Sequence, residues 1–286
     1  MRIAIIGQGH VGKGFAQFVM DHYDVVTYDP EFNESYPQDD IDTCDIAVVC
    51  VPTPMKDDGG CDISIVEAAI ERLNNSHILI KSTIPPGTTD HLRRVTGKNI
   101  LFSPEYVGES AYFNPVHRTM KETDFLIVGG PQKECEYIFN ILEPILGPYA
   151  RYFDCTPTEA EIIKYMENSF LATKVAFVNE FFEISQSFGS NWHTVREGWL
   201  LDERIGRSFS SVFADNRGFG GKCLPKDVSG IISSAEKQGY TPDLLKQVLR
   251  SNQYFQSSAS RQNEDSRAVQ DHHAAATSEY NPSTLS

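Results

Sequence analysis

The chain has 286 residues, of which 40% are hydrophobic, enough for a sizeable core in one large domain or two ordinary ones. Its formal net charge of −14 argues against a nucleic-acid-binding protein, although a small basic pocket for an anionic substrate remains compatible with it. No apolar run approaches the ~20 residues that span a bilayer, and the N-terminus carries no pattern of a signal peptide. The six cysteines contain no C-x-x-C pair, so we expect no metal site and a cytoplasmic protein with reduced thiols.

The first half of the chain alternates short apolar runs with helical patterns. Strands are predicted at Ile3–Ile6, Val25–Tyr28, Ile46–Val51, Ile78–Lys81, Ile100–Phe102, Phe125–Val128 and Arg151–Phe153. Helices are predicted between several of them, over Val11–His22, Ile63–Leu73 and Gln132–Ile145. This alternation is typical of an α/β fold: a Rossmann-like, doubly wound parallel sheet covered by helices on both faces.

The character of the sequence changes at Thr156-Pro157-Thr158-Glu159, where a capping box with proline at the first helical position predicts a helix that extends to about Phe188. Further helices are predicted near Trp192–Leu200, Val228–Gln238 and Pro242–Tyr254. The remaining residues are rich in Ser, Gln, Asn and Ala without apolar periodicity, which indicates disorder. We therefore expect a Rossmann-like domain at 1–155, an all-helical central domain at 156–256 and a disordered tail at 257–286.

A glycine-rich turn follows the first predicted strand, as Gly7-x-Gly9-x-x-Gly12. The first glycine permits a tight turn, the second lets a pyrophosphate approach the backbone, and the third lets the helix pack on the strand. Asp29 ends the next strand, where a carboxylate accepts ribose hydroxyls and disfavours the extra phosphate of NADP. The pattern predicts an NAD site; the alternative is a merely structural turn.

The motif Phe219-Gly220-Gly221-Lys222-Cys223-Leu224-Pro225-Lys226-Asp227 places a cysteine in a turn cleared by glycines. Two lysines and a following helix start favour the thiolate, which is the form that attacks a carbonyl carbon. The alternative is a packing cysteine beside a glycine turn.

Three further pairs of polar residues are candidates for the same chemistry. Lys164 and Asn168 are four residues apart on the capped helix, so both can direct donors at one oxygen; an ordinary solvated face explains the spacing equally well. Ser82-Thr83 and the pair Glu105 and Glu109 follow predicted strands at the carboxyl edge, where open α/β sheets bind ligands. Loop acids of an acidic protein are also commonly solvated.

With these motifs assembled, the chain resembles the UDP-glucose/GDP-mannose dehydrogenase family over residues 1 to about 256. The resemblance is carried by the glycine turn, Val51-Pro52-Thr53-Pro54, Lys81-Ser82-Thr83-Ile84-Pro85, Pro104-Glu105, Lys164-x-x-x-Asn168, Arg204-Ile205-Gly206 and the cysteine motif. It implies a four-electron oxidation of a nucleotide sugar, UDP-glucose to UDP-glucuronate, with two NAD⁺ per sugar.

The resemblance also implies residue roles. Cys223 would form a thiohemiacetal and then a thioester, Lys164 and Asn168 would stabilise the oxyanion, and Asp227 would support Lys164 and the water. The implied roles of the other residues are proton and water handling by Thr83 and Glu109, and substrate binding by Glu105, Lys164, Asn168, Arg204 and Gly220. The implied NAD contacts are Gly7, Gly9, His10, Val11, Gly12, Asp29, Pro52, Thr53, Ser82, Thr83 and Glu109.

Two departures from the family pattern leave alternatives open. The segment from Gly206 to Gly218 is longer than usual, and the family's last α/β domain, which grips the nucleotide, has no counterpart in the sequence. GDP-mannose is an alternative substrate, and a 3-hydroxyacid dehydrogenase or a truncated, non-catalytic NAD-binding paralogue are alternative functions. An apolar stripe on the long helix (Ile162, Ile163, Met166, Phe170) predicts a homodimer.

Overall fold

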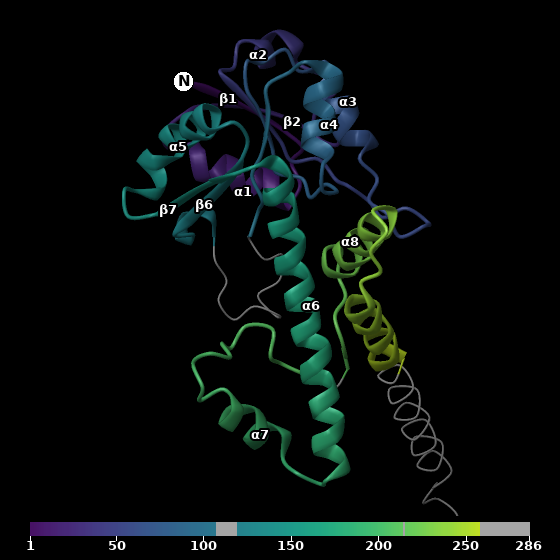
Figure 1. Ribbon diagram of the computed structural model, residues 1–286. Helices are drawn as coiled ribbons and strands as arrows, with labels where there is room; N and C mark the ends of the chain where they lie inside the picture. The colour runs from purple at the N-terminus through teal and green to yellow at the C-terminus, as the bar shows by residue number, and fades with distance from the viewer. Residues whose placement is uncertain (107–118, 214, 258–286) are drawn as a thin grey trace, which may run out of the picture. The chain divides into compact units, whose positions relative to one another are not determined.

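The computed structural model describes residues 1–106, 119–213 and 215–257 (Figure 1). The described strands are β1 (Arg2–Ile6), β2 (Asp24–Tyr28), β3 (Ile46–Val49), β4 (Ile78–Ile80), β5 (Ile100–Phe102), β6 (Phe125–Gly129) and β7 (Arg151–Cys155). The helices of the first half are α1 (His10–Val19), α2 (Gln38–Asp42), α3 (Ser64–Arg72), α4 (Thr88–Thr96), the 3₁₀ turn η1 (Met120–Glu122) and α5 (Gln132–Leu146). They are followed by α6 (Pro157–Ser187), α7 (Trp192–Trp199), α8 (Leu224–Lys237) and a helical run at 243–257.

The seven strands form one sheet in the order β2-β1-β3-β4-β5-β6-β7, which confirms the predicted Rossmann-like α/β class. In this order β2 lies on one side of β1, and β3 and the later strands lie on the other side. The direction in which strands are added to the sheet therefore reverses at β1, between β1 and β3. In open α/β sheets ligands bind outside the carboxyl ends of the strands at such a reversal. The glycine turn that follows β1 lies at this point.

The sheet departs from the parallel arrangement at one pair, because β5 and β6 are antiparallel and meet at Phe102 and Gly129. A parallel connection needs a crossover, usually a helix. Between β5 and β6 the described residues contain only the short 3₁₀ turn η1. An apolar run predicts a strand but carries no information about its direction.

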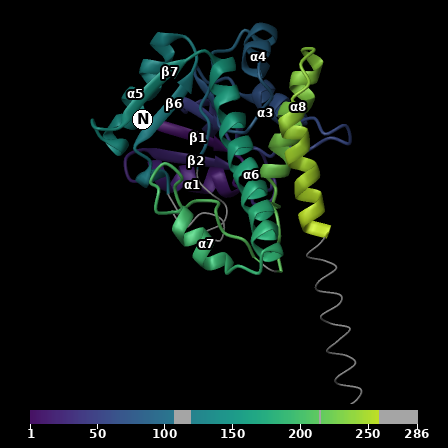
Figure 2. The same ribbon diagram turned by 60° about the horizontal axis from the view of Figure 1, so that its bottom comes forward.

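Alternating side chains of the strands build a core on each face of the sheet. In β1, Ile3 and Ile5 join the cluster of α1 and α5, whereas Ala4 and Ile6 join that of α3 and α4. All four side chains are at most 3% exposed. Figure 2 shows α1 and α5 on one side of the strands and α3 and α4 on the other.

One helix start follows its local sequence signal, one predicted helix begins earlier than expected, and one short helix was not predicted. The capping box is confirmed, because Thr156 N donates to the Glu159 carboxylate at 2.8 Å and Glu159 N donates to Thr156 Oγ1 at 3.3 Å. The helix predicted at Val228–Gln238 begins earlier, at Leu224, since Pro225 is compatible with a first helical turn. The short helix α4 was not predicted, because its sequence TTDHLRRVT is mostly polar.

The described chain forms two compact units. The first comprises Met1–Phe170 and Lys222–Pro242, and the second comprises Leu171–Gly221 and the described residues from Asp243. The domain division predicted at residue 155 stays a prediction, and the tail predicted to be disordered lies outside the described residues apart from Ser257. Within the described ranges, no helix is both long and apolar enough to cross a membrane.

Candidate active site

The glycine turn after β1 has the space that a dinucleotide requires. Gly7 has φ +95°, and a Cβ there would lie 2.6 Å from the Cys50 carbonyl oxygen. A Cβ on Gly12 would lie 1.9 Å from the carbonyl oxygen of Gly7, so the start of α1 packs directly on the turn. A Cβ on Gly9 would meet no protein atom within 4 Å. The space in front of Gly9 therefore faces outward, where a pyrophosphate can approach the backbone.

Asp29 is held next to this turn at the end of β2. Its Oδ2 accepts a hydrogen bond from Gln8 N at 2.7 Å, and its Oδ1 accepts one from Glu31 N at 2.9 Å. Asn33 closes the turn that follows, since its Oδ1 accepts a hydrogen bond from Asp29 N at 3.0 Å. The half-buried carboxylate is therefore fixed beside the glycine turn, although 21 residues separate Gln8 from Asp29.

The loops after β3 and β4 meet at the same edge of the sheet. Thr53 Oγ1 donates to the Thr83 carbonyl oxygen at 2.9 Å, and Ser82 Oγ donates to the Val51 carbonyl oxygen at 2.7 Å. Cys61 Sγ also points at the Thr83 carbonyl, at 3.6 Å, and burial raises the pKa of this thiol. The remaining predicted cofactor residues, His10, Val11 and Pro52, lie on these same segments: His10 and Val11 begin α1, and Pro52 is exposed after β3.

A buried ion pair that the sequence analysis did not identify holds Glu105. Lys81 Nζ lies 3.3 Å from Glu105 Oε2, and Lys81 is 5% exposed. Glu105 Oε1 accepts a hydrogen bond from Tyr106 N at 2.8 Å. The available signal was a lysine at the end of an otherwise apolar strand, since a buried lysine needs a partner.

A connected set of polar contacts joins α6 to the beginning of α8. Lys164 Nζ donates to the Glu105 carbonyl oxygen at 2.5 Å and to Asn168 Oδ1 at 3.4 Å. Asn168 Nδ2 donates to Asp227 Oδ2 at 2.5 Å, and Lys226 Nζ donates to Asp227 Oδ1 at 2.5 Å. Asp227 is 1% exposed, so its charge is compensated by these two donors rather than by water. Lys164 and Asn168 thus lie together, as their spacing predicts, with the amide group turned to Asp227.

Cys223 stands at the N-cap of α8 and is half-buried. Its carbonyl oxygen accepts the first hydrogen bond of the helix, from Asp227 N at 2.8 Å. The thiol residue and the buried carboxylate are thereby fixed relative to each other by one helical turn. Of the two neighbouring lysines, Lys226 is engaged by Asp227, whereas Lys222 is exposed.

Three further site residues were predicted, namely Glu109, Arg204 and Gly220. Glu109 lies outside the described residues. Arg204 and Gly220 belong to the second unit, where the exposed Arg204 guanidinium pairs with Asp202 at 2.5 Å. Among the described residues no group of three or more His, Cys, Asp or Glu side chains is arranged to hold a metal ion.

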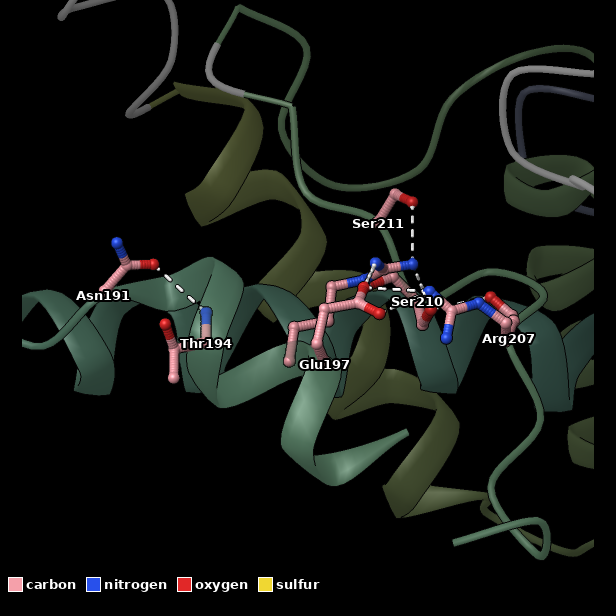
Figure 3. A network of polar contacts seen from close by, with 7 residues as sticks. Asn191, Thr194, Glu197, Arg207, Ser210 and Ser211 are labelled. Carbon is pink, nitrogen blue, oxygen red and sulfur yellow. Dashed lines mark hydrogen bonds and ion pairs between the residues drawn. The ribbon is translucent and has the colours of Figure 1, made fainter. Parts of the chain in front are cut away.

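The second unit contains a polar network that the sequence analysis did not identify (Figure 3). Arg196 of α7 donates through Nε to the Ser210 carbonyl oxygen at 2.8 Å and through Nη2 to Ser210 Oγ at 2.9 Å. Glu197 binds Arg207 Nη2 at 2.7 Å. These contacts fasten the longer segment after Gly206 to α7. Adjacent charged and hydroxyl side chains give no sequence signal that distinguishes such a network from a solvated surface.

Fold and site define an α/β dinucleotide-binding protein with a cysteine-containing helix start beside a buried carboxylate. The chain matches the NAD binding domain of the UDP-glucose/GDP-mannose dehydrogenase family over residues 26–146 and the central domain of that family over residues 158–254. It belongs to this family. NAD is the cofactor of the family's first domain, and the residues fit it: Gly9 leaves room for the pyrophosphate and Asp29 offers a carboxylate to the ribose.

Individual relatives support the same placement. A UDP-glucose 6-dehydrogenase of Rickettsia prowazekii (strain Madrid E) is 32% identical over 219 residues, which are 73% of this chain and 49% of that enzyme. The structure of a UDP-glucose dehydrogenase from the archaeon Pyrobaculum islandicum matches with a TM-score of 0.75 and 26% identity, over 88% of this chain and 68% of that one. A UDP-D-ManNAc dehydrogenase from Pyrococcus horikoshii matches with a TM-score of 0.72 and 26% identity, over 89% and 69%. The chain spans about half the length of the first of these relatives.

Proposed function

We propose that this chain carries the dehydrogenase chemistry of a nucleotide-sugar 6-dehydrogenase, which oxidises UDP-glucose to UDP-glucuronate through a thioester on Cys223. The observation that carries the proposal is the buried Asn168–Asp227–Lys226 contact set, held one helical turn from Cys223. Burying a carboxylate costs desolvation free energy even when two donors contact it, and the position of Asp227 beside Cys223 gives that cost a functional explanation. Family membership favours this reading over a 3-hydroxyacid dehydrogenase, which needs no cysteine.

The proposed reaction removes four electrons from C6 of the sugar. NAD⁺, when bound, supplies the hydride acceptor for each of the two oxidations. The first oxidation gives an aldehyde, to which the Cys223 thiol adds as a thiohemiacetal. Loss of the second hydride and the hydroxyl proton gives a thioester, and water then releases the carboxylate and the thiol.

The chain's polar residues support the charge that develops on the sugar oxygen. The Lys164 ammonium is directed by the Glu105 carbonyl and by Asn168, and it supplies a cation for the oxyanion. Glu105, held by Lys81, offers a carboxylate at the carboxyl edge of the sheet, where Thr83 also lies. Asp227 orients the Asn168 amide and, through it, Lys164.

Counting NADH per sugar tests the proposal. With UDP-glucose and NAD⁺ we expect two NADH per sugar and, after acid quenching, an acylated Cys223 peptide by mass spectrometry. Cys223→Ser should abolish both, whereas Cys155→Ser, a change at another half-buried cysteine, should leave both intact. One NADH with the aldehyde as end product would contradict the thioester. Titration calorimetry that detects NAD⁺ binding but no sugar-nucleotide binding would favour the non-catalytic paralogue.

The identity of the nucleotide sugar is a separate part of the proposal. The relatives named above act, by their names, on UDP-glucose or on UDP-D-ManNAc, and the family name includes GDP-mannose. We propose UDP-glucose, in line with the Rickettsia and Pyrobaculum enzymes. Parallel assays with UDP-glucose and GDP-mannose decide the matter, since faster turnover of GDP-mannose would overturn the choice.

We also propose a homodimer formed through α6. Large apolar side chains along this helix are exposed: Ile162, Met166, Phe170, Phe177, Phe181 and Ile184. Exposed apolar surface of this extent on one helix indicates an interface. Light scattering should give twice the chain mass, and Met166→Glu with Phe170→Glu should give a monomer; a monomeric unmodified chain would refute this proposal.

A further inference from the structure

An aromatic ring is presented to solvent on the turn that carries the Asp29 carboxylate. Phe32 lies on the turn after β2 and is 55% exposed, three residues beyond Asp29. The backbone of this turn is fixed, because the N–H groups of Phe32 and Asn33 both donate to the Asp29 carbonyl oxygen, at 3.0 and 2.9 Å. The ring therefore stands on a turn with a fixed backbone and is accessible to a ligand.

One face of this ring is covered by a cation. Lys13 Nζ lies over the Phe32 ring, 4.6 Å from its centroid, and Lys13 comes directly after the last glycine of the turn. The contact joins the first turn of α1 to the turn after β2 and favours this orientation of the ring. The ring is still more than half exposed, so surface remains for a planar ligand.

The dinucleotide supplies such a ligand at this place. If Asp29 accepts the hydroxyls of the adenosine ribose, the adenine attached to that sugar lies within one ribose of Asp29. Adenine is uncharged and planar, and an aromatic side chain stacks on its face without needing hydrogen-bond partners. We propose that Phe32, braced by Lys13, is the platform on which the adenine of NAD stacks, and that it determines the affinity for the adenosine half of the cofactor.

The proposal rests on the dinucleotide turn and not on the thiol chemistry of Cys223, so it is tested by binding alone. Titration calorimetry on the full chain would use NAD⁺ and ADP-ribose, which share the adenosine half. For Phe32→Ala we expect the Kd of both ligands to rise by about tenfold or more, because that is the usual loss of a base–aromatic stack. Phe32→Tyr keeps the ring and should stay within about threefold of the unmodified chain.

The chain offers a matched control. Phe153 is 54% exposed and lies on β7, at the opposite edge of the sheet from β2. Phe153→Ala should leave both Kd values unchanged. The proposal is overturned if Phe32→Ala behaves like Phe153→Ala, or if it weakens NAD⁺ but not ADP-ribose. Retained affinity in Phe32→Tyr shows that any loss in Phe32→Ala comes from the ring and not from a disturbed turn.

Discussion

A buried carboxylate that fastens α6 to α4 makes the stability of this protein depend on pH. Glu161 of α6 is 0% exposed and accepts three hydrogen bonds at the start of α4. Its Oε1 accepts from Thr89 N at 2.8 Å and from Thr89 Oγ1 at 2.6 Å, and its Oε2 accepts from Gly87 N at 2.5 Å. Burial raises the pKa of this carboxyl from 4.5 to about 7, since the loss of water outweighs the hydrogen bonds that favour the anion.

The sign and size of the effect follow from the direction of this shift. Because the folded state holds the proton more tightly than the unfolded state, the contribution to stability is fully present below pH 4.5 and is lost as the pH rises through about 7. A pKa difference of one unit corresponds to about 1.4 kcal/mol. Between pH 5.5 and 8 we therefore expect Glu161 to lower the free energy of unfolding by about 2 kcal/mol.

Urea unfolding of the unmodified chain and of Glu161→Gln, at pH 5.5 and pH 8, measures this contribution. The variant cannot titrate, so the difference between the two pH values should become smaller by about 2 kcal/mol. Glu159→Gln is the control on the same helix, because Glu159 is exposed and hydrogen bonds from Thr156 lower its pKa below this range. An unchanged pH dependence in Glu161→Gln would show that the reasoning from burial is wrong.

Two further predictions concern the glycine turn and a buried amide. Gly12→Ala should destabilise the fold by about 3 kcal/mol, since its Cβ would collide with the Gly7 carbonyl oxygen. Gly9→Ala should change the free energy of unfolding by no more than about 0.5 kcal/mol, because its Cβ would meet no protein atom, and should weaken NAD⁺ binding. Thermal unfolding with calorimetric NAD⁺ titration separates the two, and equal effects would contradict the geometry. Asn75→Ala should cost about 2 kcal/mol, because Asn75 Nδ2 holds the carbonyl oxygens of Ile41 and Cys44 at 2.7 and 2.8 Å. The exposed neighbour is the control: if Asn74→Ala costs as much, burial is not the cause.

Local signals in the sequence sufficed where the structure depends on near neighbours. The glycine turn is recognisable because Gly7 has a positive φ and Gly12 packs on the Gly7 carbonyl oxygen five residues away, and the capping box joins groups only three residues apart. The alternating strands could be placed for the same reason, since continuous apolar runs are expected of a sheet covered on both faces. The fold class followed from these patterns together.

The candidate site was only partly accessible from sequence, because its contacts join distant segments. The Lys81–Glu105 pair looks like two unrelated charges in sequence, and neither residue type predicts that the other will be buried beside it. Asn168 and Asp227 are 59 residues apart, and spacing along α6 suggested that the amide would face substrate rather than a carboxylate. Nothing in the sequence of α6 indicated that the Glu161 carboxyl would be buried.

What the sequence determined by itself was the set of chemical groups and their local geometry: a glycine-rich turn after the first strand, an acid at the end of the next strand and a cysteine before a helix. Packing of the whole chain decided which of these groups lose water and which partners they find. It turned β6 antiparallel to β5 and closed Asp227 away from solvent against α6. The physical reason is that turns and caps are governed by contacts within a few residues, whereas desolvation depends on every segment that covers a group.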